Sequence, residues 1–405
     1  MKILVLNAGS SSQKTCLYNI EENILPKHPP EPLWTGNIDW TVAKDHGILT
    51  VKANNFKQKI TINNGDKAEA IPKMLATLIA GETKVIEQLS DINIVGHRVV
   101  HGGTKYTEAT KINPEVKAKI AELIPLAPNH NPAHIQGIEA IEKVLGNVPQ
   151  VAMFDTAFHQ TIPLENAAYP IPFEWVDKGI RRYGFHGISH QYCANRAGEI
   201  LNQPLSSLKL INCHLGNGCS LTAIKDGKSL DTTMGFTPLE GLMMGTRSGS
   251  IDPAILLYLI REYSLTPEDL NTLLNKESGL KGVSGISADL RAILQGIKEN
   301  NSRAQLAFDM YIHRLRSQIG SMLAVLGGLD ALIFTAGVGE NAALVREKAC
   351  EAFEFLGLKL DKTKNESSPV DQNIATVDSS VNILVIHTEE DWAIAQQCWH
   401  LFTGK

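Results

Sequence analysis

The sequence predicts an α/β fold built as two domains. Short apolar segments alternate along the chain with longer segments of helical periodicity, the pattern of strands covered by helices. The length of 405 residues is enough to bury two hydrophobic cores. Residues 2–12 and 209–219 have similar sequences, which indicates that one structural unit is used twice.

Strands are expected where apolar residues run without alternation, as in strands buried on both faces of a sheet. Such runs occupy residues 3–6, 92–95, 150–154, 209–213, 331–335 and 383–386. Helical periodicity predicts helices at residues 114–123, 135–145, 189–201, 302–326 and 341–356. Residues 161–175 contain three prolines and little periodicity, so we expect them to connect the two halves.

The repeated segment consists of a lysine, an apolar strand, a polar residue and a glycine turn, followed by a second apolar segment. The polar residue is Asn7 in the first copy and His214 in the second. One interpretation is a chance resemblance between hairpins. The other is two related domains, each directing a phosphate-contacting turn into a shared site, because the exposed amides of such turns can bind phosphate oxygens.

Composition and charge argue against several classes of function. The formal net charge is −5 and basic residues are not clustered, so we expect no nucleic-acid partner. No apolar run approaches the roughly 18 residues that a membrane helix needs, and the apolar start is too short for a signal peptide. The six cysteines are scattered without a C-x-x-C pair, which favours reduced thiols in a cytoplasmic protein.

Charged residues beside glycines are the first candidates for ligand binding. Arg98 ends a predicted strand and Arg247 lies on a glycine-flanked loop, where a planar guanidinium can bind a carboxylate or phosphate. A surface salt bridge is the alternative for Arg98. His186 lies between two glycines that would expose it. Asp155 directly follows a predicted strand, where α/β sheets bind ligands, although it could equally cap a helix.

Residues 331–342 read as a strand, a glycine turn and the start of a helix. They match the dinucleotide-binding pattern G-x-G-x-x-A, so an NAD-dependent dehydrogenase is one alternative. However, only 68 residues follow Gly337, too few for the rest of a domain that normally begins with this turn. The same turn could hold the adenosine and phosphates of ATP.

Three acidic residues, Glu389, Glu390 and Asp391, open the last predicted helix. They could complement the helix dipole or bind a hard cation such as magnesium. Thr388 and Asp391 have the spacing of a capping box. An apolar stripe that should pack on the body of the protein follows at Trp392, Ala395, Trp399 and Phe402.

Seven motifs occur in one order along the chain. They are Asn-Ala-Gly-Ser-Ser-Ser-x-Lys, His-Arg-Val-Val-His-Gly-Gly, Phe-Asp-Thr-Ala-Phe-His, Tyr-Gly-Phe-His-Gly, His-Leu-Gly-Asn-Gly, Gly-Thr-Arg-Ser-Gly and Gly-Val-Gly-Glu-Asn. This series resembles the acetate kinases, within a larger group that includes actin, sugar kinases and the ATPase domain of heat-shock chaperones. The match extends from Met1 to the final helix.

The resemblance implies two actin-like, ribonuclease H-like domains around an ATP cleft, and a homodimer. Residues 1–155 and 386–405 would form the first domain, and residues 156–385 the second, nucleotide-binding one. The implied reaction is the reversible phosphorylation of acetate by ATP, giving acetyl phosphate and ADP by direct in-line transfer. Magnesium, or manganese in its place, would be the metal.

The resemblance also implies roles for individual residues. Asn7 and Glu390 correspond to the metal site. The residues implied in catalysis are Arg98, Asp155, His186 and Arg247, with His130 in support. Those implied around the substrate are Arg98, Val100, Asn129, Phe185 and Pro238. The implied nucleotide contacts are Lys14, His214, Leu215, Gly216, Asn217, Gly218, Asp289, Leu290, Arg291, Gly337, Val338, Gly339, Glu340 and Asn341.

Three positions depart from the family pattern. Asn129 stands where leucine is usual, and Ser250 where aspartate is usual. The last motif reads Thr-Glu-Glu-Asp instead of Thr-Asn-Glu-Glu, so Glu389 could compete with Glu390 for the metal. Asn129 leaves a propionate or butyrate kinase open. Alternatives from other classes are the dehydrogenase and a non-catalytic actin-like ATPase.

Overall fold

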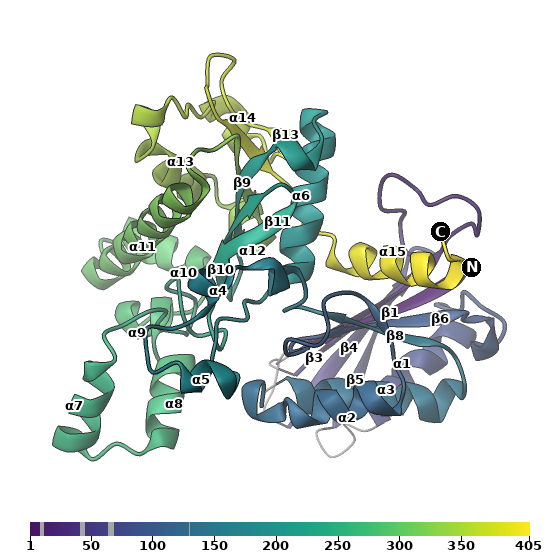
Figure 1. Cartoon of the computed structure of the whole chain (residues 1–405). Helices are drawn as coiled ribbons and strands as arrows, with labels where there is room; N and C mark the ends of the chain where they lie inside the picture. The colour runs from purple at the N-terminus through teal and green to yellow at the C-terminus, as the bar shows by residue number, and fades with distance from the viewer. Residues whose placement is uncertain (9–11, 41–44, 64–68, 129) are drawn as a thin grey trace. The chain divides into compact units, whose positions relative to one another are not determined.

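The computed structural model describes residues 1–8, 12–40, 45–63, 69–128 and 130–405 (Figure 1). The described chain forms two compact α/β units, Met1–Ala157 with Glu389–Lys405, and Phe158–Thr388. The sequence had placed these divisions two and three residues earlier, after residues 155 and 385. Residues 161–175 lie inside the second unit, so the prediction that they connect the halves was wrong. None of the described helices is long and apolar enough to cross a membrane.

The first unit is built on an eight-stranded sheet with the order β5-β4-β3-β2-β1-β6-β8-β7. Strands β1 to β5 form an antiparallel meander, and β1, β6 and β8 run parallel. The strands are β1 (Lys2–Ala8), β2 (Ser12–Asn19), β3 (Trp34–Asp39), β4 (His46–Ala53), β5 (Phe56–Asn63), β6 (Ile94–Val99), β7 (Thr110–Lys111) and β8 (Gln150–Phe154). The helices are α1 (Ala70–Ile79), α2 (Pro114–Glu122), α3 (Asn131–Leu145) and α15 (Glu390–Thr403).

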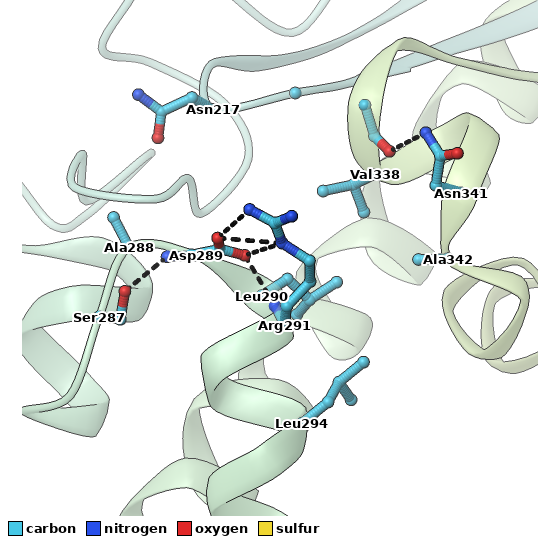
Figure 2. A pocket seen from close by; sticks show the side chains of 12 residues that line it. Asn217, Ser287, Ala288, Asp289, Leu290, Arg291, Leu294, Val338, Asn341 and Ala342 are labelled. Atoms are coloured by element: carbon cyan, nitrogen blue, oxygen red, sulfur yellow. Dashed lines mark hydrogen bonds and ion pairs between the residues drawn. The ribbon is translucent and has the colours of Figure 1, made fainter.

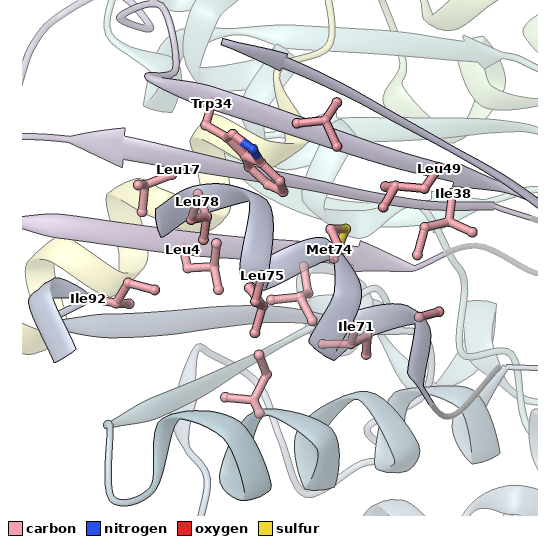
Figure 3. Packing of buried hydrophobic residues seen from close by; sticks show 14 of the residues in the cluster. Leu4, Leu17, Trp34, Ile38, Leu49, Ile71, Met74, Leu75, Leu78 and Ile92 are labelled. Atoms are coloured by element: carbon pink, nitrogen blue, oxygen red, sulfur yellow. The ribbon is translucent and has the colours of Figure 1, made fainter. Parts of the chain in front are cut away.

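Helices cover both faces of this sheet (Figure 1). On one face, Leu4 and Val95 join a buried cluster with α1 and α3 around Trp34, as Figure 3 shows for Leu4, Trp34 and their neighbours. On the other face, α15 packs closely over Gly96. A β-carbon at Gly96 would lie 2.4 Å from Ile394 Cγ2, so only glycine permits this approach. The C-terminal helix is therefore part of the first unit's core.

The second unit is built on a six-stranded sheet with the order β11-β10-β9-β12-β14-β13, which corresponds to the part β3-β2-β1-β6-β8-β7 of the first sheet. Again an antiparallel meander, β9-β10-β11, lies beside parallel strands, here β9, β12 and β14. The strands are β9 (Lys209–Leu215), β10 (Cys219–Lys225), β11 (Lys228–Thr232), β12 (Ala331–Thr335), β13 (Gln372–Asn373) and β14 (Asn382–Val385). The repeated sequence therefore reflects a repeated fold, because β1-β2 and β9-β10 occupy equivalent places in the two sheets.

The helices of the second unit are α4 (Leu164–Ala167), α5 (Glu174–Asp177), α6 (Gly187–Leu201), α7 (Ala254–Tyr263), α8 (Pro267–Lys276), α9 (Gly279–Ser284), α10 (Leu290–Lys298), α11 (Ser302–Leu326), α12 (Ala336–Asn341), α13 (Ala343–Glu351) and α14 (Lys362–Glu366). The small residues of α6 pack on one sheet face with Leu210, Ile333 and Leu384. The predicted helix at residues 341–356 proves to be α13 alone, since α12 ends at Asn341.

The start of α15 differs from the sequence-based expectation. The helix begins at Glu390, and the Thr388 hydroxyl donates to Ser189 Oγ at 2.9 Å instead of capping it, so the predicted capping box is wrong. Trp392 and Trp399 of the predicted stripe are buried, whereas Phe402 is 44% exposed. The stripe therefore packs over its first three positions only.

A buried histidine makes the first unit sensitive to acid. His97 on β6 bonds Gln150 at 2.7 Å, and burial lowers its pKa to about 4. In the unfolded chain His97 would bind a proton near pH 6.5, whereas in the folded chain it stays neutral down to about pH 4. The stability contributed by neutral, buried His97 is therefore complete above pH 6.5 and is lost as the pH falls towards 4. We expect the free energy of unfolding to fall roughly 2 kcal/mol more between pH 7 and 5 in the wild type than in His97→Gln.

Tryptophan fluorescence during denaturant unfolding measures this effect. Four of the five tryptophans (Trp34, Trp40, Trp392 and Trp399) belong to the first unit, so the signal reports mainly on that unit. The control is His28→Gln at an exposed position, which should keep the wild-type pH dependence. Equal pH dependence in all three proteins would contradict the role assigned to His97.

Candidate functional site

The parallel strands of the first unit bring three predicted site residues together. Asn7 lies near the end of β1, Arg98 lies near the end of β6, and Asp155 follows β8. Arg98 donates from Nε to Asp155 Oδ1 at 3.0 Å and from Nη2 to Oδ2 at 2.7 Å. Its Nη1 donates to Asn7 Oδ1 at 3.3 Å. Carboxyl ends of parallel strands share one edge of a sheet, which explains why residues far apart in sequence meet here.

The Arg98–Asp155 pair is largely withdrawn from water. Asp155 is 1% exposed and the Arg98 side chain 16%. Burial alone would lower the pKa of Arg98, but Asp155, Glu390 and Asp391 outweigh it and raise the pKa. Arg98 therefore stays charged, and Asp155 fixes the plane of its guanidinium through two parallel hydrogen bonds.

Two acidic residues of α15 meet Asn7. Its Nδ2 donates to Glu390 Oε2 at 3.2 Å and to Asp391 Oδ1 at 2.8 Å. Burial raises the pKa of Asp391, against the lowering effect of the hydrogen bond from Asn7. The structure thus adds Asp391 to the predicted pair Asn7 and Glu390; sequence analysis had named it both in a capping box and in the acidic run that could bind a cation. The signal was available, because Asp391 belongs to the same acidic run.

These residues fit a magnesium ion. They offer carboxylate and amide oxygens, the hard ligands that magnesium prefers. Among the described residues there is no group of three or more His, Cys, Asp or Glu side chains that could enclose a metal. Magnesium commonly takes only one or two carboxylates and completes its shell with water and substrate phosphates, so a partial protein site is what this ion needs.

Two further predicted residues of the first unit lie around this cluster. Lys14 on β2 pairs in register with Asn7, and its charge lowers the pKa of Asp391. His130 stands at the N-terminus of α3, where its charge and that of Arg98 add to the burial that lowers the pKa of His134. Lys14 therefore acts on the electrostatics of this cluster, whereas the effect of His130 is on His134.

In the second unit, two predicted histidines stack. The His186 and His214 rings lie 4.1 Å apart between centroids. His186 has a left-handed φ of 59° at the start of α6, and its Nδ1 bonds Ser220 Oγ at 2.9 Å. His214 Nδ1 bonds Ser189 Oγ at 2.8 Å. Each ring is thus oriented through Nδ1.

Arg247 lies beside these histidines at the turn between β9 and β10. A β-carbon at Gly218 would be 3.4 Å from Arg247 Nη1 and 3.6 Å from His186 Nε2. Arg247 Nη1 donates to the Pro238 carbonyl at 2.9 Å, and burial lowers its pKa. No carboxylate forms an ion pair with Arg247 within the described part of the chain. A half-buried cation of this kind is suited to receive an anionic ligand.

A pocket of about 660 Å³ begins at the same turn (Figure 2). The predicted residues that line it are Gly216, Asn217, Asp289, Leu290, Arg291, Gly337, Val338 and Asn341. Sequence reasoning missed Ser287, Ala288 and Leu294, whose small or apolar side chains carry no motif signal, and did not assign Ala342, the last residue of the G-x-G-x-x-A pattern. Figure 2 shows the Asp289–Arg291 ion pair at this pocket, with Nη2 and Oδ2 2.6 Å apart.

Several predicted nucleotide contacts do not line this pocket. Leu215, Gly218 and Gly339 are not among its lining residues, and neither is Glu340. The Glu340 carboxylate instead accepts from the Ala336 N–H at 2.8 Å and the Thr388 N–H at 3.2 Å, and pairs with His387. Ala336 has a φ of 65°, and Glu340 thereby holds the left-handed turn that starts α12.

The glycine motif at Gly337 does not open a doubly wound domain. It follows β12, which lies beside the antiparallel pair β9-β10 in a mixed sheet. The dehydrogenase alternative is therefore not supported. Among the predicted substrate residues, Val100 is buried in the first unit, and Phe185 and Pro238 belong to the second. Asn129 lies outside the described residues.

Comparison with known proteins places the chain in one family. The model of the acetokinase family matches residues 2–396. The acetate kinase of Rippkaea orientalis is 72% identical over 400 residues, covering 99% of each chain. The crystal structure of Porphyromonas gingivalis acetate kinase has a TM-score of 0.91 at 41% identity and covers 100% of each chain. A propionate kinase from Francisella tularensis has a TM-score of 0.89 at 40% identity over 98% of each chain. The chain belongs to the acetokinase family.

Proposed function

We propose that this protein catalyses the reversible phosphorylation of acetate by ATP, by direct in-line transfer of the γ-phosphoryl group. One observation carries the proposal. The turn at residues 216–218 borders the pocket at Gly216 and Asn217, and reaches His186 and Arg247 at Gly218. A nucleotide in this pocket with its phosphates at the turn would present them to an imidazole and a guanidinium.

The chemistry needs charge and alignment more than proton transfer. Acetate is already ionised at neutral pH, so no general base has to activate it. The transferring phosphoryl group is loosely bonded, with its charge spread over three oxygens. Arg247 and His186 would stabilise that charge, and Arg98, held in place by Asp155, would bind the carboxylate. The supporting geometry is the bidentate Arg98–Asp155 pair, which orients the guanidinium.

Asn7 and Glu390, together with Asp391, would hold the magnesium ion that accompanies ATP. When bound, the ion neutralises phosphate charge. We expect Glu390→Gln to raise the half-activating magnesium concentration by about 10–100-fold, because one of two carboxylates at Asn7 loses its charge. Titration of activity and of Mn²⁺ by electron paramagnetic resonance measures the change. Unchanged affinity for both metals would exclude Glu390 as a ligand.

Acetate is the proposed acyl substrate, supported by the names of the similar proteins. The test is trapping of acyl phosphate by hydroxylamine with ATP and magnesium, using acetate, propionate and butyrate in parallel. The proposal expects the highest kcat/KM with acetate. A higher value with propionate or butyrate would assign the chain to another acyl kinase. ATP binding without acyl phosphate would make it a non-catalytic relative, and ATP hydrolysis without acyl phosphate a hydrolytic one.

We further propose a homodimer formed through α7. No residue of α7 is buried, and the apolar side chains exposed on or beside it are Ile251, Ile255, Leu257, Tyr258, Ile260 and Tyr263. Monomeric proteins rarely expose so many neighbouring apolar residues, whereas obligate dimer interfaces are apolar.

We expect Leu257→Glu to convert the dimer to a monomer, because the change buries a charge in an apolar interface. Light scattering coupled to size exclusion measures the mass. The matched control is Leu306→Glu on α11, since Leu306 is 52% exposed and Leu257 is 54% exposed. A wild-type monomer would refute the dimer, and a dimeric Leu257→Glu would exclude α7 as its interface.

A further inference from the structure

Four polar side chains of the second unit form a cluster, Tyr169, Arg182, Asp231 and Glu240, which we call the Arg182 clamp. Arg182 Nη2 donates to Glu240 Oε1 at 2.9 Å, and the Tyr169 hydroxyl donates to Glu240 Oε2. Arg182 Nε lies 3.7 Å from Asp231 Oδ1, and its guanidinium lies 5.7 Å from the centre of the Tyr169 ring. Both carboxylate oxygens of Glu240 are therefore engaged, with a side chain only 32% exposed.

The clamp also holds the backbone that follows β11. Arg182 Nη1 donates to the carbonyls of Thr232, Thr233 and Met234, at 2.9, 3.2 and 3.2 Å. The Tyr169 hydroxyl accepts from the Phe236 N–H at 2.8 Å. Between these points lies Gly235. A β-carbon there would be 1.7 Å from Glu240 Oε2 and 2.1 Å from the Tyr169 hydroxyl, so the cluster packs directly on bare backbone.

This fixed segment reaches the groups assigned to phosphoryl transfer. Pro238, two residues before Glu240, accepts the hydrogen bond from Arg247 Nη1 through its carbonyl at 2.9 Å. The loop that carries Arg247 is closed by Gly241 and Ser250, whose N–H groups donate to Ser250 Oγ and the Gly241 carbonyl, both at 3.0 Å. Ser250 thus contributes a backbone tie at the position where the sequence departs from the family pattern.

The same segment also contacts the chain that leads to His186. The N–H groups of Tyr183 and Gly184 donate to the Gly235 carbonyl at 3.1 and 3.3 Å. Arg182 precedes these residues directly, so one side chain supports the approach to His186 as well as the loop of Arg247. Neither Glu240 nor Tyr169 lines the pocket at Gly216, so their influence on it would be indirect.

We propose that the Arg182 clamp sets the position of Arg247, and that Glu240 and Tyr169 are positioning residues for phosphoryl transfer. The inference rests on the proposed kinase activity. Among the described residues, the Arg247 guanidinium donates to one oxygen, the Pro238 carbonyl, so a shift of that carbonyl moves the guanidinium. A misplacement of about 1 Å at a reacting group can cost about 10²-fold in rate.

The test compares Glu240→Gln and Tyr169→Phe with the wild type. Glu240→Gln keeps the size of the side chain and removes its charge, and Tyr169→Phe removes one hydrogen bond to it. We expect kcat to fall about 10–100-fold in Glu240→Gln, and less in Tyr169→Phe, with KM for ATP within about threefold of the wild type. The matched control is Glu351→Gln, which loses the ion pair to Arg316 in the same unit at a similar exposure of 39%.

A double-mutant cycle separates positioning from general stabilisation. If Glu240 acts through Arg247, adding Glu240→Gln to Arg247→Ala should lower kcat no further. A full additional loss, or a Glu240→Gln kcat equal to that of Glu351→Gln, would overturn the inference. Absence of acyl phosphate from the wild type would instead refute the proposed function. In that case hydrogen exchange of residues 232–250 still tests whether the Arg182 clamp holds this segment. Faster exchange is expected in Glu240→Gln and not in Glu351→Gln.

Discussion

Replacing Arg247 with alanine should lower kcat by about 10³–10⁵-fold, the range expected when an arginine that stabilises a transferring phosphoryl group is removed. The reason is geometric. Arg247 Nη1 and His186 Nε2 both lie within 4 Å of the space above Gly218, at the turn that borders the pocket. Arg247→Lys keeps the charge but loses the planar fork, so we expect it to recover only part of the rate.

Nucleotide affinity provides the internal control for this variant. Arg247 does not line the pocket at Gly216, so ADP should bind Arg247→Ala with nearly wild-type affinity in calorimetry. A kcat within tenfold of the wild type would contradict the assigned role. An equal loss of ADP binding would mean that Arg247 supports the pocket and not the transferring group.

Arg98→Ala should have the second large effect, on both activity and stability. Removing the guanidinium abolishes a charge implied in carboxylate binding and takes the ion-pair partner from Asp155, which is 1% exposed. Breaking a buried ion pair from one side costs about 3–5 kcal/mol. We therefore expect kcat/KM for acetate to fall by at least about 10³-fold, and the first unit to unfold at lower denaturant concentration.

A double variant separates the two effects. Arg98→Met with Asp155→Asn removes both charges at once, so it should recover most of the lost stability, measured by tryptophan fluorescence. Its activity should remain as low as that of Arg98→Ala. Recovery of activity together with stability would show that the pair serves folding alone.

The fold was largely readable from local patterns. The strands at residues 150–154 and 331–335 and the helix at 302–326 match β8, β12 and α11 residue for residue, because each is a fully buried run or a long periodic one. The predicted helix boundaries were less accurate where a loop interrupts a helical segment, as at residues 341–356. The break between α12 and α13 falls at Ala342, where Arg346 Nη1 donates to the Glu340 carbonyl. Helical periodicity gives no sign of such a contact.

The candidate site divides in the same way. Sequence motifs, most of them beside glycines, predicted as site residues Asn7, Arg98, Asp155, His186 and Arg247. Their residue types indicate ligand binding or catalysis before any fold is known. The sequence did not indicate that the fork of Arg98 is held by Asp155, or that Glu340 supports its own turn. These are pairings between residues that lie on different strands or at different ends of a turn.

The sequence by itself determined the alternation of buried strands and helices, the repeated hairpin and the kind of chemistry, because burial periodicity and residue type are local properties. Only the tertiary structure decided which carboxylates meet at Asn7, and that Arg182, Glu240 and Tyr169 surround the support of Arg247. Asn7 and Asp391 stand 384 positions apart in the chain. A hydrogen bond between such residues depends on how α15 packs beside the strand ends of the first unit's sheet, and no local pattern encodes that contact.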